Sequence, residues 1–417
     1  MRRTGLPALL LAAALVASAC SGGGSGQDGD VVLTLWTRAA TESLSKAYAE
    51  AYNATHSTKV EVTAYPNEEY PAKLASAAGA QALPDLFAAD VVFAPQYASQ
   101  GLWTDITDRF EGLEHRDHLA PSHVRAGTWE DRNYALPHTV DLSVLLYNKD
   151  LYRKAGLDPG KPPTTLREYA DHARRIHALG GDVRGTYFGG NCGGCVEFTF
   201  WPSVWASGGD VLDDEGERAT LDSPEMAEVF EVYRSLYEEG VAAPASKDEA
   251  GPTWLGALRT GKVGIGPAAS VWLGEIAESG ADVGLAPIPG LDGGESTFVG
   301  GDALGIGATS EHADQAWDFL AWTTTEQAQV GVVAKGKNVP TRTDLAANEH
   351  AAADPRLVTA NSLVAKGRTP YARNFNASFN DPQSPWLTAL RGALFGPDPA
   401  KALAEGSTAI TASLGQG

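Results

Sequence analysis

An apolar segment with an acidic residue at its edge constrains this chain more than any other stretch. Residues 142–146 are mainly aliphatic and bounded by polar residues, which is typical of a strand buried on both faces. Asp141 directly precedes them. Because burying an unpaired charge is costly, Asp141 must either lie at an open strand end or have a partner. After the strand, residues 148–155 predict a short helix that ends at Gly156.

Strands and helices alternate in the first part of the chain. Residues 31–36, 60–65 and 84–88 have the composition of buried strands. Between them, one helix follows a cap at Thr41 and a second spans residues 71–80. This order implies a parallel α/β sheet. Farther on, we predict helices at 165–179, 223–240, 313–322, 384–394 and 400–414, and strands at 262–266, 283–288 and 303–306.

Polar residues follow two of these strands, where an open α/β sheet forms its binding crevice. Arg38 follows the first strand and Asp90 follows the third. Either residue alone could be a solvated loop charge. Together with Asp141, they provide three polar groups from three strands that could share one sheet. Their convergence would make a polar cleft.

The segment around Asp141 resembles the crossover strand of the extracellular solute-binding proteins of ABC importers, in the group that includes the maltose-binding protein. It shares with them Pro137, the acidic residue, the apolar strand and the sequence Tyr147-Asn148-Lys149-Asp150-Leu151. The resemblance continues in order over residues 31–410. Further matching pieces are residues 83–86, 207–210, 221–225, 258–264, 287–290, 300–302, 316–320 and 339–342.

This resemblance implies a two-lobed α/β fold of the type II periplasmic-binding-protein kind, with mixed, mainly parallel sheets, hinge crossovers and a cleft between the lobes. We expect residues 31–140 and about 303–340 to form the first lobe, and residues 141–302 and about 341–417 the second. In the family, the acidic residue of the crossover strand faces the cleft. The family binds solutes, so the resemblance implies no catalytic residue and no cofactor.

Aromatic residues interleaved with polar ones suggest the class of ligand. Ten tryptophans are many beside only two methionines. Sugar rings pack their C–H faces on aromatic planes, and their hydroxyls bond to carboxylates, amides and guanidinium groups. Core packing is nevertheless the commoner role of an aromatic residue, and we accept it for Trp317 and Trp322 on a helical stripe.

The predicted sugar site draws on residues 198–205, 272–275 and 373–386 in addition to the three strand ends. Trp272 follows a loop rather than a periodic pattern, and it matches a cleft tryptophan of the family. Within the site, the acids would accept hydrogen bonds from sugar hydroxyls, the arginines would donate them and the rings would stack. The expected ligand-binding residues are Arg38, Asp90, Asp141, Phe198, Trp201, Trp272, Asp302, Arg373 and Trp386.

The N-terminus has the features of an exported lipoprotein. A basic start precedes an apolar stretch, residues 6–19, that is too short to span a bilayer comfortably. The stretch runs into Ala17-Ser18-Ala19-Cys20, which resembles a bacterial lipobox. We expect residues 1–20 to be a signal peptide, Cys20 to be acylated, and residues 21–30 to tether the protein to the outer face of the cytoplasmic membrane. A plain cleaved signal peptide is the alternative.

The other two cysteines form the sequence Cys192-Gly193-Gly194-Cys195. In an exported chain this pair favours a small structural disulfide that holds a loop near the cleft. A redox motif of the thioredoxin type is the alternative, and it requires the first cysteine at the start of a helix. Gly193-Gly194 is a poor helix start, so we favour a structural bond between Cys192 and Cys195.

The charge of the chain restricts its partners. A formal net charge of −20 disfavours nucleic acid and anionic membrane surfaces. His115, His118 and His123 make a weak case for a metal site, because Pro121 interrupts them and no four-ligand set is evident. We expect no metal, no nucleic acid partner and contact with the membrane through the lipid anchor alone.

The expected function is capture of a small sugar, by preference an oligosaccharide, by a monomeric protein that delivers it to the permease of an ABC importer. Two alternatives stay open. Carboxylates beside aromatic rings also serve glycoside hydrolases, which need two carboxyl groups about 5–5.5 Å or 6.5–9.5 Å apart. Capture of an anionic solute such as a glycerophosphodiester would need a basic cluster in the cleft, and only scattered arginines are visible.

Overall fold

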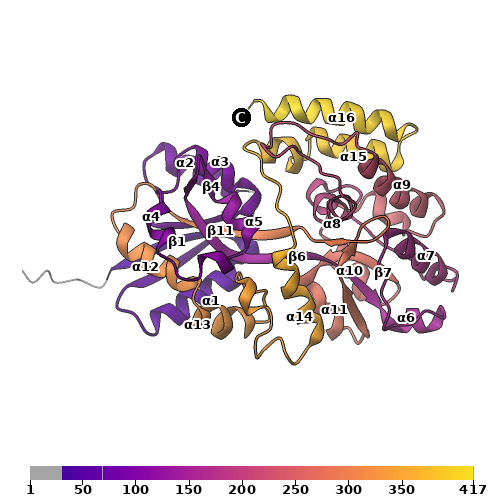
Figure 1. The fold of residues 1–417 in the computed structure, drawn as a ribbon, viewed down its shortest axis with the longest axis horizontal. Coiled ribbons are helices and arrows are strands. Elements are labelled where there is room, and N and C mark those ends of the chain that lie inside the picture. Colours follow the sequence, from indigo (N-terminus) through magenta and orange to yellow (C-terminus); the bar gives the residue numbers. More distant parts are fainter. Residues whose placement is uncertain (1–30, 68, 417) are drawn as a thin grey trace, which may run out of the picture.

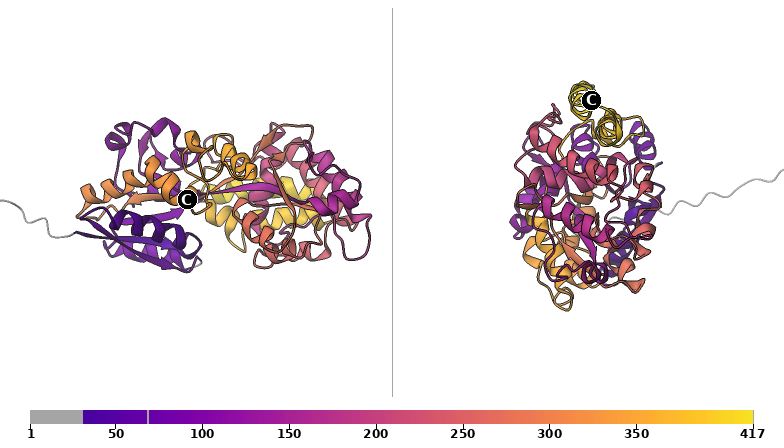
Figure 2. Two further views of the ribbon diagram at one scale, coloured as in Figure 1. Left: turned by 90° about the horizontal axis from the view of Figure 1, so that it is seen from below. Right: turned by 90° about the vertical axis from the view of Figure 1, so that its right-hand side faces the viewer.

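Two lobes joined by long β-strands make up the molecule (Figures 1 and 2). The computed structural model describes residues 31–67 and 69–416. The signal peptide, Cys20 and the tether of residues 21–30 lie outside the described residues, so these predictions stay predictions. Within the described residues, no helix has both the length and the apolar character needed to cross a bilayer.

One mixed sheet runs through both lobes. Its strand order is β2-β1-β3-β11-β6-β7, and β8 also pairs with β6. β1 pairs in parallel with β2 and β3, whereas β11 and β6 make antiparallel pairs. The α/β class is therefore confirmed. The strands of this sheet are β1 (Val32–Arg38), β2 (Lys59–Tyr65), β3 (Leu86–Asp90), β6 (Ala135–Asn148), β7 (Ile265–Ala269), β8 (Val283–Ala286) and β11 (Val299–Ile306).

β6 is the strand that joins the lobes. Its first part, up to Leu142, pairs with β11 beside β3 of the first lobe. Its second part, from Ser143, pairs with β7 and β8 in the second lobe. At ~3.3 Å per residue its 14 residues reach roughly 45 Å, which is long enough to serve both halves of the sheet. The strand predicted at 142–146 is therefore the middle of a longer one.

Helices pack against the first-lobe part of the sheet. In α1, Tyr48, Ala49 and Tyr52 recur at helical spacing and are all buried. Thr41 is the N-cap residue of α1 as predicted, but its hydroxyl makes no capping hydrogen bond and instead donates to Asp302. The elements of this lobe are α1 (Glu42–Asn53), α2 (Tyr70–Gly79), α3 (Ala94–Ser99), α4 (Thr107–Glu111), α5 (Pro121–Ala126), β4 (Thr128–Trp129), β5 (Arg132–Asn133), α12 (Ala313–Thr323) and α13 (Glu326–Ala328).

Longer helices build the second lobe. α7 and α9 begin where the helices were predicted to start, and the hydroxyls of Thr165 and Ser223 cap them by accepting from backbone N–H groups of the first turn. α16 packs against α15 along the upper edge of this lobe in Figure 1. The elements are α6 (Lys149–Lys154), α7 (Leu166–His177), α8 (Gly193–Ala206), α9 (Pro224–Glu238), α10 (Trp254–Arg259), α11 (Leu273–Glu278), β9 (Ile288–Pro289), β10 (Glu295–Ser296), α14 (Pro355–Ser362), α15 (Pro385–Phe395) and α16 (Pro399–Leu414).

α8 corrects the interpretation of Gly193-Gly194 as a poor helix start. The helix begins at Gly193, and the Sγ of its N-cap Cys192 accepts from the N–H of Cys195 at 3.1 Å. Glycine is needed there for space, because a Cβ on Gly193 would lie 2.5 Å from the carbonyl oxygen of Phe379. Gly193-Gly194 does start a helix, so this sequence gives no argument against a redox motif.

Candidate ligand-binding cleft

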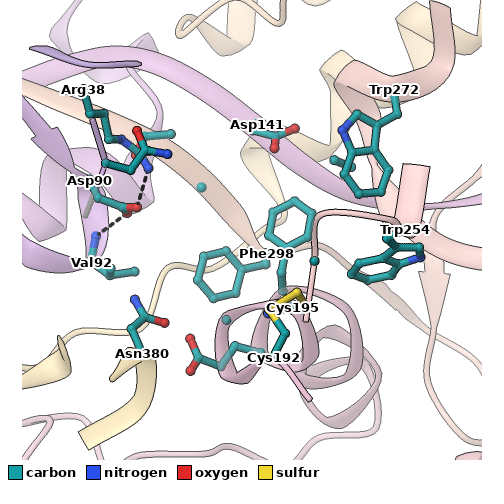
Figure 3. Close-up of a pocket in the computed structure, with 18 residues that line it drawn as sticks. Arg38, Asp90, Val92, Asp141, Cys192, Cys195, Trp254, Trp272, Phe298 and Asn380 are labelled. Carbon is teal, nitrogen blue, oxygen red and sulfur yellow. Dashed lines mark hydrogen bonds and ion pairs between the residues drawn. A yellow bond between two sulfur atoms is a disulfide. The ribbon is translucent and has the colours of Figure 1, made fainter. Parts of the chain in front are cut away.

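A cavity of about 680 Å³ lies between the lobes (Figure 3). Its volume is in the range of small-molecule sites. β6 and β11 contribute Asp141, Gly300 and Gly301 to its lining. The first lobe contributes Arg38, Asn67, Asp90 and Val92, and the second contributes Cys192, Gly194, Cys195, Glu197, Phe198, Gly251, Trp254, Ala269, Trp272, Phe298 and Asn380.

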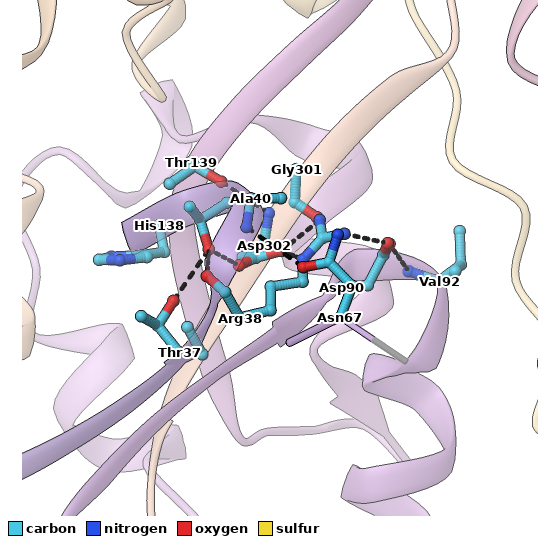
Figure 4. Close-up of polar contacts among 12 residues, drawn as sticks. Thr37, Arg38, Ala40, Asn67, Asp90, Val92, His138, Thr139, Gly301 and Asp302 are labelled. Carbon is cyan, nitrogen blue, oxygen red and sulfur yellow. Dashed lines mark hydrogen bonds and ion pairs between the residues drawn. The ribbon is translucent and has the colours of Figure 1, made fainter. Parts of the chain in front are cut away.

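Arg38, at the end of β1, is held by two carboxylates (Figure 4). Its Nη1 lies 2.9 Å from Oδ2 of Asp90, and its Nε and Nη2 lie 2.7 and 2.6 Å from Oδ1 of Asp302. The three residues meet because Asp302 of β11 is the register partner of Asp90 of β3, which lies beside β1. Although burial opposes the charge of Arg38, the two carboxylates raise its pKa. Arg38 and Asp90 thus converge as predicted.

Asp302 supports this ion pair from below the cavity surface. Its side chain is fully buried. Besides the bonds from Arg38, its Oδ2 accepts from the hydroxyl of Thr41 at 2.6 Å, and its backbone N–H donates to the hydroxyl oxygen of Thr139 at 2.9 Å. Because Asp302 does not line the cavity, the prediction that it contacts the ligand is corrected: it positions Arg38.

Asp141 lies in the interior of β6, where the strand changes its partner from β11 to β7. Of the two alternatives for this carboxylate, the structure shows a partner rather than an open strand end. Its Oδ1 accepts from the N–H of Leu142 at 2.9 Å and from the hydroxyl of Ser270 at 3.4 Å. Burial raises the pKa of Asp141 to about 6, and these hydrogen bonds oppose that shift. Burial likewise raises the pKa of Asp90, although the positive charge of Arg38 opposes this shift.

Aromatic rings form much of the second-lobe wall (Figure 3). Trp272 and Trp254 meet edge to face with ring centroids 5.6 Å apart, and Phe198 and Phe298 lie 5.6 Å apart at a tilt. Such pairs hold the orientation of their rings. Trp272 and Phe198 lie in the wall, as the sequence predicted. Trp254 and Phe298 were missed, although Trp254 follows a Gly-Pro loop and shares the non-periodic setting that pointed to Trp272.

Three other predicted site residues lie outside the cavity lining. Trp201 and Trp386 are completely buried in the second-lobe core, with ring centroids 5.3 Å apart. Neither has a face free for a sugar, because each occupies an inward position of a packed helix, the commoner place for a tryptophan. Arg373 lies over the ring of Trp129, with its guanidinium carbon 5.3 Å from the centroid. None of these three residues is thus among those that line the cavity.

Three polar residues of the lining were not predicted, namely Asn67, Glu197 and Asn380. Asn67 lies in a turn, where it accepts from the N–H of Ala40 at 3.2 Å, and Asn380 is the last residue of a short π-helix, Asn376–Asn380. Glu197, in contrast, has a recognisable sequence signal. It is an acid inside an otherwise apolar stretch, which is the same pattern that drew attention to Asp141.

Cys192 and Cys195 lie at disulfide-bonding distance and line the cavity at the N-terminal end of α8 (Figure 3). The expectation of a cysteine pair near the cleft is thus confirmed in position. The site as a whole offers carboxylate acceptors, one guanidinium donor, and aromatic faces on the opposite wall. This combination suits a polar solute with flat apolar faces, as sugar rings have.

Known proteins share this architecture. The diacetylchitobiose binding protein DasA of Streptomyces coelicolor is 26% identical over 423 residues, which cover 96% of each chain. A solved structure of the cyclic alpha-maltosyl-1,6-maltose binding protein from Arthrobacter globiformis has a TM-score of 0.79 at 24% identity, covering 93% of this chain and 100% of that one. The sugar-binding protein MalE of Xanthomonas citri has a TM-score of 0.80 at 18% identity, covering 93% and 98%. These structural likenesses confirm the two-lobed fold.

A family model described as bacterial extracellular solute-binding protein matches residues 47–359. This span includes β6, with its Asp141 and Tyr147-Asn148-Lys149-Asp150 sequence, and most of the cavity lining. The chain therefore belongs to the family of bacterial extracellular solute-binding proteins.

Proposed function

We propose that this protein captures a sugar, by preference an oligosaccharide, outside the cytoplasm and delivers it to the permease of an ABC importer. One observation carries the proposal. The lining of the cavity between the lobes combines the Arg38–Asp90 pair and Asp141 with the rings of Trp272 and Phe198. Carboxylates and a guanidinium bind hydroxyls, while the rings pack on the C–H faces of a pyranose.

Capture would use hinge bending between the lobes. β6 and β11 run past the cavity and carry residues of its lining, so a small change in these strands moves one wall toward the other. Closure would exclude water from the polar contacts and strengthen them. The protein would act as a monomer, with one ligand in one cleft.

Glycoside hydrolysis is a second candidate, and one observation favours it. Burial raises the pKa of Glu197 well above its ordinary value and that of Asp141 to about 6, and a hydrolase needs a carboxyl group that stays protonated. Membership in a family of binding proteins favours capture instead. Incubation with oligosaccharides followed by chromatography separates the two, because only a hydrolase yields shorter products.

Capture of an anionic solute is less well supported. Arg38 is the one cationic side chain in the cavity lining formed by the described residues, and it is already paired with Asp90 and Asp302. A phosphate would therefore meet more carboxylates than cations. A screen of neutral, cationic and anionic sugars by thermal shift, followed by calorimetry on those that bind, tests the proposed class of ligand. Stabilisation by anionic sugars alone would contradict it.

We further propose that the protein is lipid-anchored through Cys20 and that Cys192 and Cys195 are bonded to each other. The short leader, the lipobox-like ending and the Gly/Ser-rich tether support the anchor. Mass spectrometry of the purified protein should find an acylated Cys20 at the N-terminus, and Cys20→Ser should abolish acylation. Thiol alkylation before and after reduction should differ by two cysteines. Unacylated wild-type protein, or equal labelling, would overturn the corresponding proposal.

A further inference from the structure

Glu197 is a buried acid in the cleft wall, and one of its carboxyl oxygens has no hydrogen-bond partner among the described residues. It lies on α8 beside Phe198, lines the cavity and is 2% exposed. Its Oε1 makes no hydrogen bond to any of the described residues. Buried polar atoms in folded proteins are almost always satisfied, so an orphaned carboxyl oxygen at a ligand cavity indicates that the ligand is its partner.

The charges around Glu197 indicate what kind of ligand group is missing. Arg38, the single cationic side chain in the described lining, is committed to Asp90 and Asp302. Asp141 has a hydroxyl and an N–H as partners but no cation in contact. Burial, together with the negative charge of Asp90, raises the pKa of Glu197 well above its ordinary value. The cavity therefore has an excess of carboxyl groups.

A ligand hydroxyl could fill one hydrogen bond of Glu197, but it would leave the carboxyl group in the neutral form that burial favours. An ammonium group supplies both missing features, because it has three N–H donors and a positive charge. The surroundings also suit it, since Phe198 and Phe298 line the same cavity and aromatic faces attract cations.

We propose that Glu197 binds the ammonium group of an amino sugar, so that the cleft prefers oligosaccharides with a free amine over their N-acetylated forms. This inference rests on the proposed capture of a sugar. It assigns to the protein a specificity residue and a class of ligand, namely cationic oligosaccharides.

The test compares two ligands of the same skeleton, the β-1,4-linked disaccharide of glucosamine and its diacetylated form, by calorimetry on the purified full-length protein below the pKa of the amine. Maltose serves as a neutral sugar without nitrogen. A charge-assisted hydrogen bond predicts at least about tenfold tighter binding of the free amine. In Glu197→Gln this ratio should fall to about one. Glu231→Gln, which neutralises an exposed acid on α9, should retain the wild-type ratio.

The outcomes separate the inference from the proposed function. Equal or weaker binding of the free amine by wild-type protein overturns the role of Glu197 while leaving sugar capture intact. If a folded Glu197→Gln protein still prefers the free amine, the role of Glu197 is likewise overturned while sugar capture stays intact. Thermal unfolding shows whether this variant is folded. If folded wild-type protein binds none of the three sugars, both the inference and the choice of a sugar ligand are overturned. If Glu197→Gln does not fold, the wild-type ratio alone decides.

Discussion

The two walls of the cleft are built on different physical principles. On the first-lobe side, Arg38 and Asp90 extend from the ends of sheet strands, and the fully buried Asp302 holds them. On the second-lobe side, Trp254 and Trp272 stand where short helices begin, and they contact each other edge to face. Removing a charge from the first wall leaves other buried charges unpaired, whereas removing a ring from the second mainly removes contact area. We therefore expect substitutions in the first wall to change both ligand affinity and the free energy of unfolding. Substitutions in the second wall should mainly change ligand affinity.

Arg38→Met should have the largest effect on stability. Loss of the guanidinium leaves Asp302 buried without its cation and Asp90 without its ion pair. Removing one partner of a buried ion pair costs about 3–5 kcal/mol, so the free energy of unfolding should fall by that amount in chemical denaturation. Arg153→Met is the matched control, because Arg153 pairs with Asp150 and Asp282 at a half-exposed site. The control should cost at most about 1 kcal/mol. Equal losses would show that the first wall is not a stability element.

Trp272→Ala tests the opposite wall. A central aromatic residue of a binding site typically contributes about 2 kcal/mol, so ligand affinity should fall roughly thirtyfold in calorimetry. Because Trp272 is only partly buried, the effect on unfolding should be smaller than that of Arg38→Met. Trp129→Ala removes a partly buried tryptophan outside the cavity and should leave affinity unchanged. Unchanged affinity in Trp272→Ala would remove the aromatic wall from the proposed site.

Asp141→Asn tests the role of β6, the strand between the two walls. The change keeps one acceptor but removes the charge-assisted hydrogen bonds to the ligand, so affinity should fall roughly tenfold. Burial already disfavours the charged form of Asp141, so the variant should unfold at neutral pH with no less free energy than the wild type. A lower melting temperature with intact affinity would mean that Asp141 is a structural residue and not a ligand contact.

A further prediction concerns the pH dependence of the stability of the unliganded protein. Folding raises the pKa of Asp141 from 3.8 to about 6, so the folded state binds more protons than the unfolded state between these values. Its contribution to stability is present below about pH 4 and is lost as the pH rises through about 6. The unfolding free energy of the wild type minus that of Asp141→Asn should therefore fall by up to roughly 3 kcal/mol over this window. A difference independent of pH would contradict the buried setting of this carboxylate.

Local sequence patterns predicted the strands and most long helices. The stripes and caps of α7 and α9 depend on residues within one or two turns, so their signals are complete in the sequence. α8 was missed because it is apolar around most of its circumference and starts with two glycines, which hides the 3.6-residue period. The strand predicted at 262–266 is β7, Ile265–Ala269, shifted toward the C-terminus.

Site residues could be predicted where a polar residue interrupts a strand pattern. They could not be predicted where helix packing decides whether a side chain is buried or lines the cavity. Arg38, Asp90 and Asp141 each stand out against an apolar run. Trp386 and Trp272 are chemically the same residue, and only the second lines the cavity. Whether each ring is buried or lines the cavity depends on which helices pack against it, and no local sequence pattern indicates this packing.

By itself, the sequence determined the α/β class, the strand that crosses between the lobes, the carboxylate in that strand and membership in a solute-binding family. The contact between Arg38 and Asp302, which is 264 residues away, arises from the folding of the whole chain, and so does the cleft position of Glu197, whose Oε1 makes no hydrogen bond to the described residues. The physical reason is the range of the interactions. Helix and strand formation depends on neighbouring residues, whereas an ion pair across a sheet depends on strand order and register. Those are set by the packing of the whole chain.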